Sequence, residues 1–235
     1  MIELEWHEYD TPVEMADAVA CDVAGVIEHA LEDRGEAFIA LPGGTSPIPA
    51  FERLAAAQID WDRVTIIPTD DRLVPITDPL SNAAMIASRF LPKGARVLPI
   101  VVGETSDYRR AGQAADARLA ELAWPLDLVW LGVGADGHTA SIFPGPDLED
   151  ALNGAKSRKA VGVLPDPMPA EAPVARITLS RAAILSARSL LLTFSGTEKR
   201  AVVERALRAG THSRTPIGRV LSGVKGPIDI RWSAA

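Results

Sequence analysis

A repeated order of short apolar run, glycine-rich or polar turn, and helical segment restricts the fold of this chain more than any other feature. Apolar runs of strand length lie at 37–41, 64–67, 126–133 and 190–194, and helical patterns lie at about 46–57, 81–90, 107–122 and 197–208. Strands that alternate with helices favour a parallel sheet with both faces covered. We therefore predict an α/β fold with an open, mostly parallel, doubly wound sheet and helices on both faces.

The N-terminal segment carries a complete helix-start signal. Thr11 supplies a capping hydroxyl, Pro12 occupies the first helical position, and Glu14 completes a capping box. Apolar residues then recur at three- and four-residue spacing, which indicates one buried helical face. Cys21 lies within this pattern, where it is either a small helix residue or a nucleophile. As the single cysteine, it excludes an intramolecular disulfide, a cysteine-based zinc cluster and a redox CxxC motif.

The charge balance argues against polyanionic partners. The chain has 235 residues, with 24 Lys and Arg against 31 Asp and Glu, which gives a formal net charge of −7. Nucleic acids and membrane surfaces attract proteins with a basic footprint, so we predict neither as a partner. A small anion remains compatible with a local basic pocket.

Targeting and domain signals are sparse. The longest apolar run, residues 128–135, is far shorter than the roughly 18 residues of a membrane helix. The N-terminus is acidic where a signal peptide is basic, and we expect a cytoplasmic protein. Six prolines between 143 and 173 predict an irregular segment there. A domain linker is one interpretation; because strand patterns continue on both sides, we favour a surface excursion within a single domain of residues 1–235.

Four loops collect the unusual polar residues of the chain: 42–47, 69–72, 132–141 and 195–199. Each follows an apolar run, so in a parallel sheet all four reach the carboxyl-terminal edge. Ligands of open α/β sheets bind in the crevice beyond that edge. We therefore expect the functional site where these loops meet.

The first loop, Gly43-Gly44-Thr45-Ser46-Pro47, is suited to an anion. Paired glycines allow the backbone to approach a ligand closely, and free amides at a helix start attract negative charge. An ordinary strand-to-helix turn with Ser46 as the helix cap explains the same residues, and the motif alone favours neither interpretation. The lysine and spacing of a P-loop are missing, so a nucleoside triphosphate is not implied.

The third loop begins with Gly132-x-Gly134-x-x-Gly137, which matches a dinucleotide-binding pattern. Asp136 would place a carboxylate against the pyrophosphate, and no strand ending in an acidic residue follows about 20 residues later. We therefore reject a dinucleotide. His138 is the better candidate. It is either a general base whose orientation and tautomer the Asp136 carboxylate fixes, or a structural or solvated loop residue.

The remaining charged residues of the loops allow two interpretations each. Asp70-Asp71-Arg72 is either a solvated charge run or a place where Arg72 meets an anion. Lys199, in the first turn of a helix, is either an exposed lysine or a cation compensated by a ligand anion. The acidic residues of these loops and His138 fit no recognised ligand set, so we predict no metal. A GxSxG elbow is absent from the sequence.

Five motifs occur in order along the chain. They are Gly43-Gly44-Thr45-Ser46-Pro47, Asp70-Asp71-Arg72 with Ser81-Asn82, Gly132-x-Gly134-x-Asp136-Gly137-His138-Thr139-Ala140-Ser141, Arg176-Ile177-Thr178-Leu179 and Gly196-x-x-Lys199. Across about residues 36–205 the chain resembles the 6-phosphogluconolactonases of the glucosamine-6-phosphate isomerase/6-phosphogluconolactonase superfamily. The resemblance implies a Rossmann-like sheet similar to that of glucosamine-6-phosphate deaminase. The deaminases continue after the histidine with Ile-Ala-Phe-Asn-Glu-Pro, whereas Thr139 to Pro144 here contain no glutamate, which favours the lactonases.

The activity that the resemblance implies is hydrolysis of 6-phospho-D-glucono-1,5-lactone to 6-phospho-D-gluconate, in the pentose phosphate or Entner–Doudoroff pathway, without a metal or organic cofactor. In this interpretation His138, oriented by Asp136, activates water and then protonates the departing ring oxygen. Arg72 and Lys199 bind the phosphate, helped by Gly44 and Thr45. The full set of implied substrate- and phosphate-binding residues is Gly43, Gly44, Thr45, Ser46, Asp71, Arg72, Arg176 and Lys199.

Two departures and two alternatives accompany this resemblance. Asp71 stands where the lactonases usually have glutamate, which bears on how Arg72 is held, and Pro42 stands where serine is common, which bears on turn geometry. A sugar-phosphate deaminase or isomerase and an inert sugar-phosphate sensor are the alternative functions. Sensors of this fold usually carry a DNA-binding segment, and the first 33 residues here contain no Lys or Arg. The sequence leaves open a monomer or a homodimer.

Overall fold

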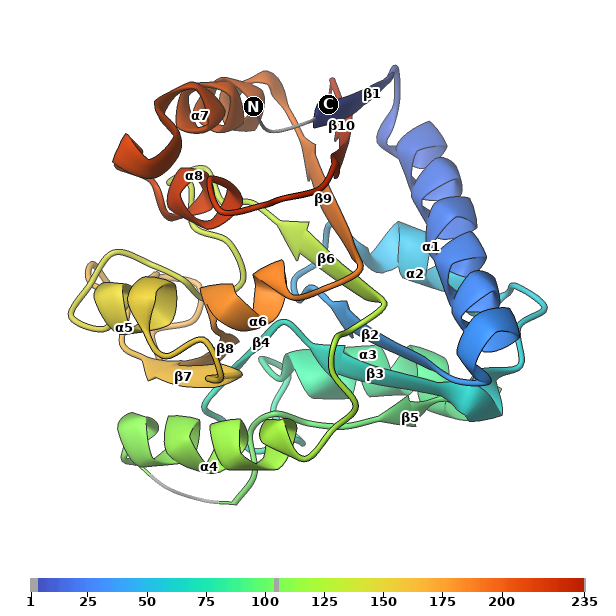
Figure 1. Ribbon diagram of the computed structural model, residues 1–235, viewed down its shortest axis with the longest axis horizontal. Coiled ribbons are helices and arrows are strands. Elements are labelled where there is room, and N and C mark those ends of the chain that lie inside the picture. Colours follow the sequence, from blue (N-terminus) through green and yellow to red (C-terminus); the bar gives the residue numbers. More distant parts are fainter. Residues whose placement is uncertain (1–3, 104–105, 235) are drawn as a thin grey trace.

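A seven-stranded sheet forms the centre of the computed structural model, which describes residues 4–103 and 106–234 (Figure 1). In spatial order its strands are β1 (Leu4–Tyr9), β10 (Ile228–Ser233), β9 (Ser189–Ser195), β6 (Leu128–Gly132), β2 (Ala37–Leu41), β3 (Val64–Pro68) and β5 (Arg96–Val97). Every neighbouring pair runs parallel. The predicted open parallel sheet is confirmed.

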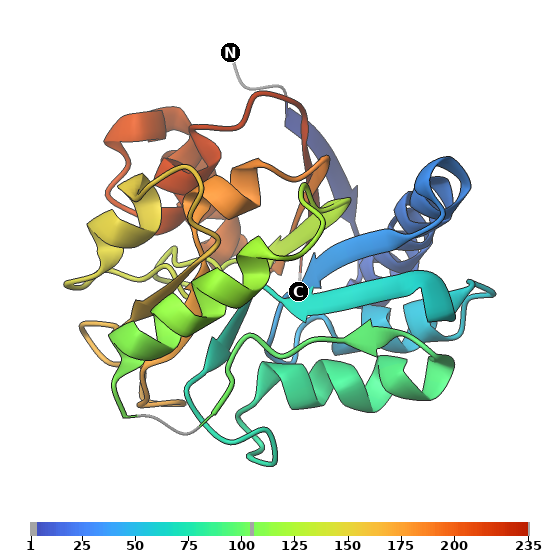
Figure 2. The same ribbon diagram turned by 60° about the horizontal axis from the view of Figure 1, so that its bottom comes forward.

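Helices cover both faces of this sheet, as predicted (Figures 1 and 2). One face packs against α1 (Pro12–Arg34), α2 (Ile48–Ala55) and α3 (Asn82–Phe90). The core on the other face includes residues of α4 (Tyr108–Ala120), α5 (Leu148–Asn153), α6 (Arg181–Leu185), α7 (Thr197–Ala209) and α8 (Pro216–Leu221). Short 3-10 turns lie at Trp61–Arg63, Leu91–Lys93 and Gly210–His212.

The central strands are apolar without interruption because both of their faces are buried. In β2, Ile39 and Leu41 enter the core under α1 to α3, while Phe38 and Ala40 enter the opposite core. Side chains alternate between the faces of a strand, so a strand covered on both sides has no polar positions. Burying each large side chain contributes roughly 1.5–3 kcal/mol. The sheet is therefore a rigid platform for the loops at its edge.

Two helix starts differ in how closely they match the sequence patterns. The capping box of α1 is present, with the Glu14 amide donating to Oγ1 of Thr11 at 3.2 Å. In contrast, α2 begins only at Ile48, after Pro47, and has no side-chain cap. The Ile48 amide donates to the Thr45 carbonyl at 3.2 Å, so a backbone turn precedes the helix. The interpretation of Ser46 as a helix cap is wrong.

A second, three-stranded antiparallel sheet joins the first. Its strands are β4 (Asp70–Arg72), β8 (Arg176–Leu179) and β7 (Ala160–Val163). Residues 69–72 were predicted as a loop, but the chain passes from β3 through Thr69 directly into β4. The solvated-charge interpretation is also wrong, because Asp70 and Asp71 are only 6% and 1% exposed. Their burial follows from pairing with β8, a partner more than a hundred residues away in the chain.

The proline-rich segment 143–173 is only partly irregular. It contains α5 and β7, so the prediction of an irregular excursion over its whole length is wrong. Prolines are confined to the stretches outside these elements, where no amide is needed for a regular hydrogen bond.

The strand order reverses between β2 and β6. From β2 the chain proceeds outward through β3 to β5, and from β6 it proceeds the other way through β9 to β10. Crevices that bind ligands open at such switch points, beyond the carboxyl ends of the strands. The loops after β2 and β6 are the first and third of the predicted functional loops.

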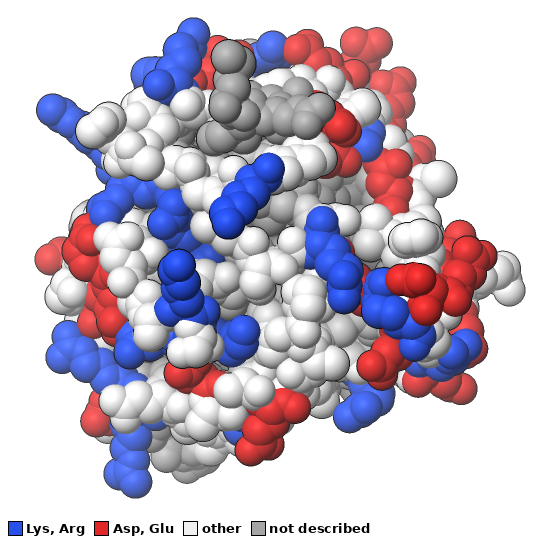
Figure 3. Space-filling model, in the orientation of Figure 1, with Lys and Arg blue, Asp and Glu red and all other residues white. Residues whose placement is uncertain are grey.

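Charge is unevenly distributed over the surface. Acidic side chains gather along α1, at the right in Figure 3. The exposed positions of this helix include Glu14, Asp17, Glu28, Glu32 and Asp33.

Within the described part of the chain, no helix is both long and apolar enough to cross a membrane.

Candidate active site

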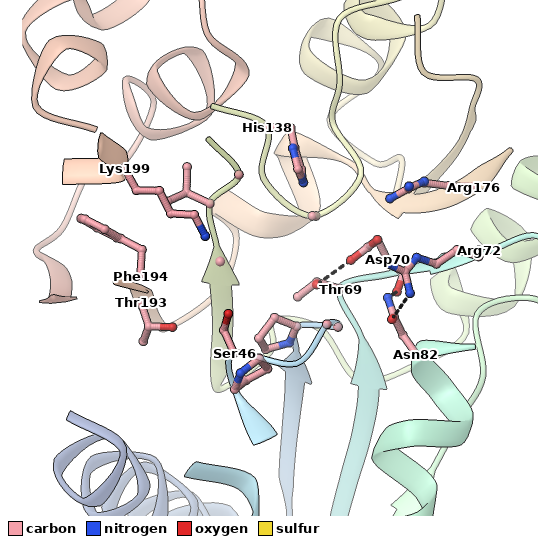
Figure 4. Close-up of a pocket in the computed structure, with 18 residues that line it drawn as sticks. Ser46, Thr69, Asp70, Arg72, Asn82, His138, Arg176, Thr193, Phe194 and Lys199 are labelled. Atoms are coloured by element: carbon pink, nitrogen blue, oxygen red, sulfur yellow. Dashed lines mark hydrogen bonds between the residues drawn. The ribbon is translucent and has the colours of Figure 1, made fainter. Parts of the chain in front are cut away.

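A cleft of about 240 Å³ opens at the switch point (Figure 4). All four predicted loops contribute to its lining, including Gly43, Arg72, His138 and Lys199. Two further elements add residues to it, Asn82 at the start of α3 and Arg176 on β8, and the end of β9 adds Thr193 and Phe194. The structure thus brings the predicted loops together in one place.

His138 and Asp136 form a close pair in the loop after β6. Nδ1 of His138 lies 2.6 Å from Oδ1 of Asp136, and the same oxygen accepts the His138 backbone N–H at 3.1 Å. The His138 side chain is 30% exposed, and its ring lies at the cleft (Figure 4). When Asp136 accepts the Nδ1 proton, Nε2 is left as a proton acceptor. This is the arrangement of a general base.

The glycines of this loop have different surroundings. A Cβ on Gly134 would lie 2.3 Å from Nδ1 of His138 and 2.6 Å from Oδ1 of Asp136. Gly137 has φ +82°, and its Cβ would lie 2.7 Å from Thr215, whereas nothing lies within 4 Å of a Cβ at Gly132. Gly134 is therefore the glycine that the close packing of the His138–Asp136 pair requires.

Hydrogen bonds keep Asp136 ionised. Burial pulls the pKa of Asp136 upward, but the ring hydrogen bond, the charge and the backbone N–H of His138 together bring that pKa below its ordinary value. A carboxylate that stays charged stabilises the protonated imidazole that forms when the histidine accepts a proton.

A ring stack fixes the face of the imidazole. The rings of His138 and Phe143 are stacked, with centroids 4.0 Å apart and planes inclined by 21°. The guanidinium of Arg176 lies 4.9 Å from the centroid of the same Phe143 ring. Sequence reasoning missed Phe143, whose only signal is its position five residues after His138.

Asp71 lies outside the cleft lining and binds the start of α3 behind it. Its carboxylate accepts the backbone N–H groups of Asn82 at 2.7 Å and Ala83 at 3.0 Å. Burial raises the pKa of Asp71 to about 6, although these amide bonds oppose the shift. The predicted contact between Asp71 and substrate does not match this position; Asp71 caps α3 instead, because its side chain points away from the ligand side of β4.

Asn82 is the residue through which Asp71 reaches the cleft. Its Oδ1 accepts from Nη1 of Arg72 at 3.0 Å, and its Nδ2 donates to the Asp70 carbonyl at 2.8 Å (Figure 4). Nη1 of Arg72 also donates to the Leu80 carbonyl at 2.9 Å. Arg72 is therefore held in place by the start of α3. Asn82 was noted in the sequence only as part of a motif, without a role.

Asp70 ties the second sheet to the histidine loop. Its Oδ2 accepts from the Ser141 hydroxyl at 2.5 Å, and its Oδ1 accepts from the Thr69 hydroxyl at 3.2 Å. The Ser141 amide donates to Oγ1 of Thr178 on β8 at 3.2 Å. The two loops that carry Arg72 and His138 thus form one hydrogen-bonded unit.

Lys199 faces the cleft from the side opposite Arg72 and Arg176 (Figure 4). It lies in the first turn of α7. The N-cap residue of this helix is Gly196, which has no side chain to cap the first amides. The first amides of a helix lack intrahelical partners and favour an anion. Ser46 lines the cleft as well, whereas Thr45 lines an adjoining cavity that shares Ser46 with it.

Metal ligation has no support in the described residues, 4–103 and 106–234. They include no group of three or more His, Cys, Asp or Glu side chains arranged to hold a metal ion.

Comparisons with known proteins find relatives over nearly the whole chain. The family model for glucosamine-6-phosphate isomerases/6-phosphogluconolactonase matches residues 10–228. A 6-phosphogluconolactonase of Mesorhizobium japonicum is 37% identical over 232 residues, 97% of this chain and 94% of that protein. The crystal structure of a 6-phosphogluconolactonase from Shewanella baltica is 32% identical with a TM-score of 0.89, covering 99% of this chain and 98% of that one.

A monomeric glucosamine-6-phosphate deaminase shares the fold alone, at 18% identity and a TM-score of 0.79, with 97% of each chain covered. The resemblance inferred from the motifs is confirmed by the family match and by relatives similar over nearly their whole length. The chain belongs to the glucosamine-6-phosphate isomerase/6-phosphogluconolactonase family.

Proposed function

We propose that this protein hydrolyses 6-phospho-D-glucono-1,5-lactone to 6-phospho-D-gluconate. The observation that carries the proposal is the His138–Asp136 pair, with 2.6 Å between Nδ1 and Oδ1, at a cleft that cations line on two sides. Relatives named 6-phosphogluconolactonase at 31–37% identity support the same substrate. The reaction belongs to the pentose phosphate or Entner–Doudoroff pathway, and the enzyme to the cytoplasm.

The reaction needs a base and later an acid at one position. Nε2 of His138 takes a proton from water as the water oxygen bonds to the lactone carbonyl carbon. The tetrahedral intermediate then expels the ring oxygen, which takes the proton from the imidazolium. Asp136 stays ionised and stabilises that imidazolium. A positioned acid–base group of this kind accelerates a reaction by roughly 10²–10⁴-fold.

The phosphate lies at the Lys199 end of the cleft in this proposal. Gly44, Ser46 and Lys199 line the cleft, and Lys199 lies in the first turn of α7, so we assign the phosphate to the Lys199 side chain, the Ser46 hydroxyl and the neighbouring backbone amides. A phosphate dianion meets both a side-chain charge and helix-start amides at such a place. Binding energy from this remote group positions the carbonyl against His138.

The test compares two lactones. Purified protein is assayed by proton release on freshly prepared 6-phosphogluconolactone and on unphosphorylated gluconolactone, each against its spontaneous hydrolysis. We expect acceleration of the phosphorylated lactone only, and loss of most of it in His138→Asn. His212→Asn is the matched control, since His212 is exposed on a surface turn and its substitution leaves activity intact.

Two results would overturn the proposal. No acceleration of the phosphorylated lactone contradicts the substrate, and full activity in His138→Asn contradicts the mechanism. Release of ammonia from glucosamine 6-phosphate assigns the chain to the deaminase branch instead.

A further inference from the structure

Two arginines lie directly opposite each other on neighbouring strands of the second sheet, beside the cleft. Arg72 on β4 and Arg176 on β8 are direct partners in the antiparallel register. Like charges directly opposite each other on neighbouring strands destabilise a sheet. Both residues also line the cleft. Such a pair is expected where an anion or a developing negative charge offsets the repulsion.

Neither guanidinium is saturated by the protein. Arg176 is only 5% exposed, and its Nη2 donates to the Ala172 carbonyl at 3.3 Å. Within the described residues, the Nε atoms of Arg72 and Arg176 are buried without a hydrogen-bond partner. Leaving buried donors of a charged group unpaired is costly. These unused donors are therefore available to a ligand in the cleft.

The nearby carboxylates are directed elsewhere. Asp70 accepts from Ser141 and Thr69, and Asp71 accepts from the start of α3. Burial lowers the pKa of Arg176, while the charge of Asp70 opposes that shift without direct contact. The positive charge of the arginine pair is thus left facing the cleft.

An aromatic ring links Arg176 to His138. Phe143 stacks on His138 and also carries the Arg176 guanidinium over its ring. Figure 4 shows Lys199 entering from the other side, with His138 between it and the arginines. The cleft therefore has two cationic ends, and the arginine end shares the Phe143 ring with His138.

We infer that Arg176, with Arg72 opposite it, binds the carbonyl oxygen of the lactone, the oxyanion of the tetrahedral intermediate and the carboxylate of the product. This rests on the proposed function, and it separates the roles of the cations: Lys199 holds the phosphate, and the arginine pair serves the reacting end. Arg176 is then a catalytic residue, and Arg72 acts beside it.

The water oxygen bonds to the carbonyl carbon, its proton moves to His138, and the carbonyl electron pair moves onto the carbonyl oxygen, which the guanidinium groups stabilise. The pair returns as the bond from carbon to ring oxygen breaks, and the ring oxygen receives the proton. The product carboxylic acid ionises and remains opposite the arginines until it leaves.

Two ligands separate the ends of the cleft. 6-Phosphogluconate carries a carboxylate and a phosphate, whereas glucitol 6-phosphate has the same chain and phosphate but a hydroxymethyl group in place of the carboxylate. Binding of each is measured by calorimetry to the whole protein. We expect Arg176→Gln to weaken phosphogluconate by at least tenfold and glucitol 6-phosphate by less than twofold. Lys199→Gln weakens both ligands by a similar factor.

Kinetics supply the second measurement. Loss of one oxyanion donor typically lowers kcat by about 10²–10³-fold, so Arg176→Gln and Arg176→Lys are expected to lower kcat for the lactone strongly, with KM within threefold of the wild type. Arg181→Gln is the matched control, because Arg181 is also partly buried and has its pKa lowered by burial but lies outside the cleft lining.

Several results would contradict the assignment of Arg176 to the reacting end. Equal weakening of both ligands in Arg176→Gln, or a raised KM with kcat retained, places Arg176 at the phosphate and overturns the inference. Unchanged binding and kcat do so as well. If the wild type fails to hydrolyse the lactone, the proposed function fails, whereas the two-ligand comparison still reports on the arginine pair. Arg176→Lys keeps the charge and the fold if Arg176→Gln is unstable.

Discussion

A single carboxylate oxygen of Asp136 receives both the ring Nδ1 and the backbone N–H of His138, at 2.6 and 3.1 Å. The double contact sets the plane of the ring as well as its tautomer. Because the backbone N–H also binds this oxygen, the carboxylate cannot turn away without breaking two bonds. Nε2 of His138, the ring nitrogen at the cleft, is consequently kept as the proton acceptor of the neutral ring.

Asp136→Asn is expected to lower kcat by about 10²-fold or more, since an amide at this position no longer stabilises the imidazolium. KM changes little, because Asp136 lies behind the histidine. The pKa of Asp136 is lowered in the wild type, so Asp136 is ionised at neutral pH. Steady-state kinetics of wild type and variant at neutral pH check the prediction. Retention of more than half of the wild-type kcat contradicts it.

Asn82→Ala is expected to lower kcat/KM by about tenfold, because Arg72 loses the amide oxygen that fixes Nη1. Leaving the Asp70 carbonyl without its donor also costs about 1–3 kcal/mol of unfolding free energy. Lactone kinetics and urea denaturation measure the two effects. Asn153→Ala is the control, since the exposed Asn153 side chain donates to Glu149 on the same helix, away from the cleft lining. Equal effects from the two substitutions would refute a special role for Asn82.

Gly43→Ala tests the same support from the other side. A Cβ at Gly43 would lie 2.1 Å from the Asn82 side chain, so Asn82 must move and Arg72 with it. We expect a loss of kcat/KM similar to that of Asn82→Ala. In Gly25→Ala nothing lies within 4 Å of the added Cβ, and alanine stabilises this helical position by roughly 0.5–1 kcal/mol. An unchanged kcat/KM in Gly43→Ala would contradict the inference that Asn82 holds Arg72 in position.

Asp71 makes stability depend on pH. Burial raises its folded pKa to about 6, above the ordinary aspartate value of 3.8, so the folded state binds the proton more tightly than the unfolded state. The stabilisation from this proton is greatest below about pH 4 and is lost as pH rises through about 6, by about 3 kcal/mol in total. In Asp71→Asn this dependence disappears. Denaturation at several pH values checks whether the difference between wild type and variant changes across this window; Asp62→Asn, at an exposed position, is the control. A constant difference contradicts the prediction.

The central strands were predictable because their residues are apolar on both faces. Strands β2, β3, β6 and β9 match the predicted runs within two residues. The outer strands β1 and β10 were missed, since sequences such as Leu4–Tyr9 and Ile228–Ser233 mix charged and apolar residues. Strand β5 has only two residues, Arg96–Val97, too few to show a pattern.

The second sheet could not be predicted from local pattern. Strand β4 consists of three charged residues, and its pairing with β8 joins segments that lie far apart in the chain. A single sequence shows no signal for such long-range pairing. This pairing is also what buries Asp71 and places Arg72 opposite Arg176, so the roles of these three residues depended on the structure.

The contact between His138 and Asp136 was predictable because it is local. Asp136 and His138 are two residues apart, and glycines mark the tight turn around them. Asn82 and Phe143 were not assigned, because their contacts with Arg72 and His138 depend on how separate elements pack. Sequence reasoning therefore identified the His138–Asp136 pair and the cations of the cleft but not the residues that hold them.

The passage from β3 to β4 through Thr69 means that the two ends of the cleft belong to different sheets. Lys199 follows a strand of the large sheet, whereas the arginine pair is carried by the small one. Because Ser141 ties the histidine loop to β4 and β8, a sideways displacement of the small sheet would carry the arginine pair and the Asp136–His138 loop together. The span between Lys199 and the arginine pair therefore depends on how the small sheet joins the large one through Thr69.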